Sequence, residues 1–180
     1  MKSLVLGVGN PIRGDDGVGL VVAERLCVRL GPEAEYVPFS GTGFDLLGWV
    51  EGFERVVIID AMVDGRLGEG ECARLDPPRP ADWHVDLSSH RGSIVDAIAL
   101  AHRLGIRMPG DVRWYGVGIA PPDDYREGLS ARLQPQIDRI VEQIREDLDE
   151  NPRVADGAEP RPAGATEPRA SASGRWRGAT

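Results

Sequence analysis

Apolar residues follow two spacings along this chain, and the change between them predicts strands that alternate with helices. Short apolar runs, typical of strands, cover residues 3–9, 34–38, 55–59, 71–75 and 112–119. Apolar residues with a helical period cover residues 16–30, 44–50, 90–104 and 125–150. Because strands that alternate with helices form a sheet covered by those helices, we expect an α/β fold.

The expected architecture is a three-layer sandwich of the phosphorylase/hydrolase-like type, in which a five-stranded, mostly parallel twisted sheet carries helices on both faces. Residues 55–59 are almost wholly apolar, which favours a central strand. Residues 71–75 follow after a short turn and are expected as an antiparallel edge strand. We predict that the strands lie in the order 34–38, 3–9, 55–59, 112–119 and 71–75.

Composition divides the chain near residue 150. Residues 1–150 are expected to form one domain. Ala, Gly, Pro and Ser make up seventeen of the last thirty residues, so 151–180 is expected to be a disordered tail. The formal net charge is −8 for the whole chain and +2 for the tail, which leaves −10 on residues 1–150. This acidic domain disfavours a nucleic-acid partner, which requires clustered Lys and Arg.

Hydropathy and cysteine content indicate where the protein works. No apolar run is long enough to span a bilayer, and the first residues lack a signal-peptide pattern, so no membrane partner is expected. Cys27 and Cys72 lie far apart in an expected helix and an expected strand. Two such cysteines form no disulfide framework, and a reducing cytoplasm is the simpler prediction.

Three acidic residues follow the first and third expected strands. Asp15 and Asp16 come after a glycine-rich turn, and Asp60 comes directly after the apolar run 55–59. Either Asp15 or Asp16 is placed to cap the next helix, but the two cannot both do so, and a bound cation would relieve their repulsion. Arg13 is an alternative neutralising neighbour. For Asp60 the alternative is that it caps a helix or orders a loop, although a buried acid at a strand end is costly without a partner.

Of the three histidines, His90 is the best placed for chemistry. His84 lies in a loop of no clear pattern, and His102 is expected on the helix surface. His90 lies where a helix is expected to begin, after Ser88 and Ser89, and the helix dipole there keeps an imidazole neutral and able to bind a metal. Two carboxylates and one imidazole would suit Ni, Zn or a similar ion, with positions left open.

Other chemistries find little support in the sequence. The cysteines fall inside regular elements, where thiols are inert, and Ser88, Ser89 and Ser93 lack a nucleophile-elbow pattern. Residues 7–9 begin like a dinucleotide fingerprint, but the third glycine is misplaced and two acids would repel a pyrophosphate.

Three blocks of this sequence, 7–19, 56–61 and 88–97, resemble the maturation endopeptidases of nickel-iron hydrogenases. They read GVGNPIRGDDGVG, VVIIDA and SSHRGSIVDA, and GTGFDLL at 41–47 is also similar. The similarity runs in order from about residue 3 to 147, so it is more specific than any single motif. It implies the five-stranded fold expected above.

The resemblance also implies a function. Such enzymes remove a C-terminal extension from the hydrogenase large-subunit precursor after nickel insertion. Their nickel-sensing and catalytic positions fall on Asp16, Asp60 and His90, with Asp15 as a secondary participant. The nickel would be carried by the substrate, no organic cofactor is implied, and a monomer is expected. The resemblance leaves open which group activates the attacking water.

Three other functions remain as alternatives. A peptidyl-tRNA hydrolase-like enzyme has a similar Gly-Asn-Pro turn, but it needs an early histidine and a basic channel, and the first histidine here is His84. A nickel-binding chaperone could use the same residues without cutting. A zinc hydrolase could hold a metal of its own.

Overall fold

The structure is a computed structural model that describes residues 1–39, 43–63, 65–75, 101–122 without 102 and 107, and 125–150. Most of the expected helix 90–104, the three histidines and the tail 151–180 lie outside the described residues. No helix among the described residues is long and apolar enough to cross a membrane.

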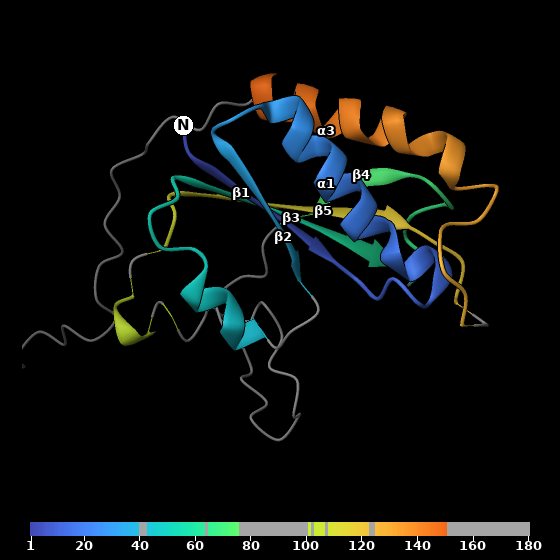
Figure 1. The fold of residues 1–180 in the computed structure, drawn as a ribbon, viewed down its shortest axis with the longest axis horizontal. Helices are drawn as coiled ribbons and strands as arrows, with labels where there is room; N and C mark the ends of the chain where they lie inside the picture. The colour runs from blue at the N-terminus through green and yellow to red at the C-terminus, as the bar shows by residue number, and fades with distance from the viewer. Residues whose placement is uncertain are drawn as a thin grey trace, which may run out of the picture.

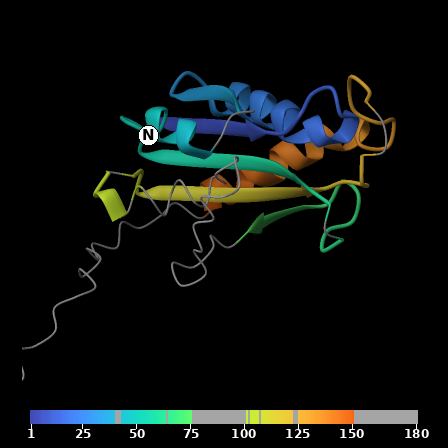
Figure 2. The same ribbon diagram turned by 90° about the horizontal axis from the view of Figure 1, so that it is seen from below.

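The sheet has the predicted topology. Its five strands are β1 (Ser3–Val8), β2 (Ala34–Phe39), β3 (Arg55–Met62), β4 (Cys72–Leu75) and β5 (Asp111–Gly118). They lie in the order β2-β1-β3-β5-β4, and only the edge strand β4 runs antiparallel to its neighbour (Figure 2). Both the strand order and the antiparallel edge are therefore confirmed.

Helices cover the sheet on both faces. Helices α1 (Val18–Leu30) and α3 (Ile137–Glu150) lie side by side on one face (Figure 1). On the other face, the short 3-10 helix η2 (Gly43–Gly48) packs its Leu46 against the strands. Successive side chains of a strand point to opposite faces of the sheet. Val57 and Ile59 therefore pack on the face of α1 and α3, while Val56 and Ile58 pack on the face of η2.

Two expected helices differ from prediction. The helix expected over 44–50 is the 3-10 helix η2, and the helix expected over 125–150 begins only at η4 (Gln134–Gln136), with Pro135 at its start, and continues as α3. Residues 125–130, called here the return segment, instead lie against the turn after β1. Gly128 has φ +79°, a conformation that ends a helix rather than continuing one.

The first turn of α1 lies directly on the carboxyl ends of β1 and β3. A Cβ added to Gly19 would lie 2.3 Å from the carbonyl oxygen of Val8 and 2.4 Å from that of Ile59. A Cβ on Gly9, where φ is +146°, would lie 2.0 Å from the carbonyl oxygen of Asp16. These approaches are shorter than any side chain allows, so glycine at both positions fixes the turn against the sheet.

Buried charges lie at the opposite, amino end of β3 and β5. The Asp111 carboxylate accepts hydrogen bonds from Arg55 Nε at 2.8 Å and from Arg113 Nε at 3.0 Å. Arg113 also donates to the carbonyl oxygen of Asp147 in α3, at 3.0 Å. Burial alone would raise the pKa of Asp111, but the two guanidinium groups outweigh it and hold this pKa below its usual value.

Substitution of Gly19 by alanine is expected to destabilise the protein by about 3 kcal/mol or more, because the new methyl group must push α1 off the strand ends. Gly48→Ala is the matched control, since a Cβ there has no neighbour within 4 Å. Urea unfolding of both variants measures the effect. Equal midpoints for Gly19→Ala and the wild-type protein would contradict the close contact.

Candidate active site

The turn after β1 carries two acids toward the end of β3. Asp15 and Asp16 lie in the 3-10 turn η1 (Gly14–Gly17), directly before α1. A hydrogen bond within the turn orients the Asp16 carboxylate, because the backbone N–H of Asn10 donates to its Oδ2 at 3.1 Å. Residues 10–17 are called the acid turn below. Gly19, shortly after this turn, packs closely against the carbonyl oxygen of Ile59, the residue before Asp60.

Asp60 lies inside β3 rather than after it. The strand continues to Met62 because β5 pairs with it throughout, with Asp60 opposite Gly116. By strand alternation, the Asp60 side chain shares the sheet face of Val56 and Ile58. Its Oδ1 accepts a hydrogen bond from the N–H of Ala61 at 2.8 Å. The prediction that the strand ends at residue 59 was wrong by three residues.

The electrostatic environment of Asp60 is unusual for an acid. Burial raises the pKa of Asp60, the hydrogen bond from Ala61 opposes this, and the negative charge of Asp16 raises it further. No Lys or Arg among the described residues forms an ion pair with Asp60 or Asp16. Asp111 at the other end of the sheet has two arginine partners and a lowered pKa. A half-buried acid with a raised pKa and no such partner among the described residues is typical of a functional site.

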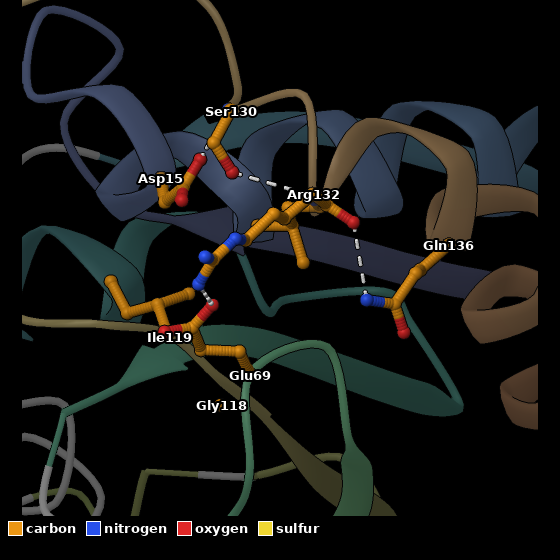
Figure 3. Close-up of a pocket in the computed structure, with 8 residues that line it drawn as sticks. Asp15, Glu69, Gly118, Ile119, Ser130, Arg132 and Gln136 are labelled. Atoms are coloured by element: carbon orange, nitrogen blue, oxygen red, sulfur yellow. Dashed lines mark hydrogen bonds and ion pairs between the residues drawn. The ribbon is translucent and has the colours of Figure 1, made fainter.

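Asp15 points to a different part of the chain. Its Oδ1 accepts the backbone N–H of Ser130 at 2.6 Å, and the Arg126 guanidinium lies 3.9 Å from the same oxygen. Figure 3 shows Asp15 beside Ser130 at the edge of a small cavity also lined by Arg132. Arg13, the alternative neutralising neighbour, makes no ion pair with a described residue, and the cation that pairs with Asp15 among the described residues is Arg126.

Neither acid caps α1. The helix begins after Gly17, which makes no side-chain cap, so the capping prediction was wrong. The reason is geometric: the acids occupy the preceding 3-10 turn, and their oxygens accept hydrogen bonds from Asn10 and Ser130 instead.

His90 lies outside the described residues, as do His84 and His102. Among the residues that the structure describes, no three His, Cys, Asp or Glu side chains gather as a metal site. The structure therefore places Asp16 near enough to Asp60 for its charge to raise the pKa of Asp60, and His90 as their third partner stays a prediction.

The two thiols have raised pKa values. Burial raises the pKa of Cys72 to about 12, and burial also raises that of Cys27. Both thiols are therefore protonated at neutral pH and unsuited to nucleophilic attack. This agrees with the sequence argument against a cysteine nucleophile.

The return segment is the part of this region that the sequence pattern does not predict. The apolar spacing indicates a helix there, although Pro121 and Pro122 precede the segment and Gly128 interrupts it. Glycine and proline are poor helix residues, and their spacing was the available signal.

Comparison with known proteins gives consistent relatives. No protein-family model matches the chain. The hydrogenase 2 maturation protease of Escherichia coli (strain K12) is 27% identical over 152 residues, which are 81% of this chain and 92% of that protein. The hydrogenase expression/formation protein HupD of Rhodobacter capsulatus is 29% identical over 149 residues, 81% of this chain and 70% of that protein.

Solved structures agree with these relatives. The hydrogenase maturating endopeptidase HybD from E. coli superimposes with a TM-score of 0.60 and 26% identity, covering 84% of this chain and 94% of that one. The resemblance noted in the sequence is therefore confirmed, as is the α/β fold that it implied.

The pH dependence of stability tests the environment of Asp60. Because the pKa of Asp60 is raised in the folded protein, folding disfavours the ionised form, and stability is lost as pH rises above the unfolded value near 3.8. Asp60→Asn removes this penalty, so the variant should gain stability relative to wild type as pH rises from about 4, until the raised pKa of Asp60 is passed.

Urea unfolding from pH 4 to 8 measures this difference. Glu51→Gln is the control, because this exposed acid lies at the opposite end of the sheet. A difference that does not change with pH would contradict the raised pKa.

Proposed function

We propose that this chain is a hydrogenase maturation endopeptidase, similar in activity to the relatives that it matches over most of its length. It removes the C-terminal extension of a nickel-iron hydrogenase large-subunit precursor after nickel has been inserted. The observation that carries the proposal is the charge interaction of Asp16 with Asp60, without a cationic partner among the described residues, in a chain similar to such proteases.

Nickel carried by the precursor would supply the missing positive charge. A cation between two carboxylates relieves their repulsion and favours the ionised form of both. Asp16 and Asp60 then act as oxygen ligands, and His90 supplies the imidazole. The site senses nickel because its acids are stabilised only when the loaded metal centre is present.

Peptide hydrolysis needs a water molecule activated beside the scissile carbonyl. The water oxygen bonds to the carbonyl carbon, its proton passes to a carboxylate of the site, and the departing amine takes a proton as the C–N bond breaks. We assign this chemistry to an aspartic-type or metal-dependent endopeptidase, with Asp16, Asp60 and His90 at its centre. No organic cofactor takes part.

The remaining proposals concern context. The partner is the large-subunit precursor, and the −10 charge of residues 1–150 disfavours nucleic acid. We propose that the enzyme acts as a monomer in the cytoplasm, where its two thiols remain reduced.

The deciding experiment incubates the full chain with nickel-loaded and nickel-free precursor and measures the intact mass of the precursor. Loss of a C-terminal peptide is expected only with nickel. Cleavage of both forms would overturn nickel sensing. Nickel-dependent binding without cleavage would indicate a chaperone, and stoichiometric zinc in a purified protein that cleaves without nickel would indicate a zinc hydrolase.

Single substitutions assign the residues. Asp16→Asn, Asp60→Asn and His90→Ala should each slow processing by roughly 100-fold or more, since each removes a metal-facing group. Asp138→Asn and His102→Ala are the matched controls, because Asp138 is exposed on α3 and His102 lies outside the three similar blocks. Unimpaired processing by one of the three variants would remove that residue from the site.

A further inference from the structure

We propose that Asp15 is a positioning residue, which fastens the return segment to the acid turn and thereby holds Asp16 in place. This inference rests on the proposed function and gives Asp15 a role different from metal binding. The charge that acts on Asp60 belongs to Asp16, whereas the Asp15 carboxylate accepts a hydrogen bond from Ser130.

Three hydrogen bonds join the acid turn to the return segment. The N–H of Gly14 donates to the carbonyl oxygen of Arg126 at 2.7 Å, and the N–H of Arg126 donates to that of Ile12 at 2.9 Å. The third is the N–H of Ser130, which donates to Asp15 Oδ1 at 2.6 Å and is the only one of the three that uses a side chain. A substitution at residue 15 therefore removes one defined link and leaves the other two.

The link through Ser130 is stronger than the ion pair beside it. The Asp15 side chain is only 18% exposed, while that of Arg126 is 57% exposed and lies 3.9 Å away. A hydrogen bond to a largely buried charged acceptor contributes more than an exposed ion pair, which water and salt weaken. The backbone N–H of Ser130 is therefore the partner on which the position of Asp15 depends.

Ser130 also leads into the second helix that packs beside the site. Its Oγ and its carbonyl oxygen both accept from the N–H of Leu133, at 3.2 and 3.1 Å, in the turn before η4 and α3. Helix α3 packs on α1, whose first turn follows Asp16. Asp15 thus closes a ring from the acid turn through Ser130 and α3 back to α1, and Asp16 lies within that ring.

The test compares Asp15→Ala with Asp15→Asn. Alanine removes the acceptor, whereas asparagine keeps a side-chain oxygen for the Ser130 N–H and loses only the charge. With nickel-loaded precursor, Asp15→Ala should slow processing by roughly 10- to 100-fold, because a small misplacement of a reacting group has this effect. Asp15→Asn should retain activity within about threefold of wild type.

Hydrogen exchange of the free protein tests the link without reference to catalysis. The Ser130 amide should exchange roughly tenfold or more faster in Asp15→Ala than in wild type, and should remain protected in Asp15→Asn. If the wild-type protein does not cleave the precursor, the proposed function fails, while the exchange data still report on the link.

Three results would overturn the inference. Equal loss of processing in Asp15→Asn and Asp15→Ala would show that the charge itself is required, as for a ligand or a proton carrier. Unchanged exchange at Ser130 in Asp15→Ala would show that the link does not hold the segment. Arg126→Ala, which removes only the exposed ion pair, would contradict it by reproducing the full effect of Asp15→Ala.

Discussion

The close approach of α1 to the ends of β1 and β3 determines the geometry of this region. Gly19 lies against the carbonyl oxygens of Val8 and Ile59, where no Cβ would fit, so the helix starts directly above the strand ends. The acid turn, which connects β1 to that helix, must then pass beside the residue after Ile59. That residue is Asp60, so the contact made by Gly19 explains why the charge of Asp16 acts on Asp60 although 44 positions separate them in the sequence.

The acids at the two ends of the sheet have opposite electrostatic environments. At the amino end, Arg55 and Arg113 both donate to Asp111, so its pKa is lowered and its charge is satisfied within the protein. At the carboxyl end, Asp60 is half-buried, and partial burial and the negative charge of Asp16 both raise its pKa. The first arrangement stabilises the fold, because each charge has its partner. In the second, no Lys or Arg among the described residues forms an ion pair with Asp60, and a raised pKa in such a setting is typical of a functional site.

The apolar pattern predicted the central strand and the antiparallel edge of the sheet, whereas the order of the strands is not determined by that pattern. Residues 56–59 are wholly apolar, which favours a central strand, and the short connection to residues 71–75 favours an antiparallel edge strand. Because β1 and β3 are parallel neighbours, their carboxyl ends lie at the same edge of the sheet. The acids at those two ends are therefore near each other. The expected end of β3 was wrong because pairing with β5, a tertiary contact, extends the strand beyond the apolar run.

The division of roles between Asp15 and Asp16 could not be predicted in this way. Local patterns offered capping as the function of an acid before a helix, and a cap is a contact between near neighbours in sequence. The actual partner of Asp15 is the N–H of Ser130, 115 residues further along the chain. Ser130 is available only because Gly128 and Pro135 prevent residues 125–133 from continuing as a helix. Two acids that look equivalent in sequence are thus distinguished by a long-range contact of Asp15 with the backbone, and Asp16 is the acid whose charge acts on Asp60.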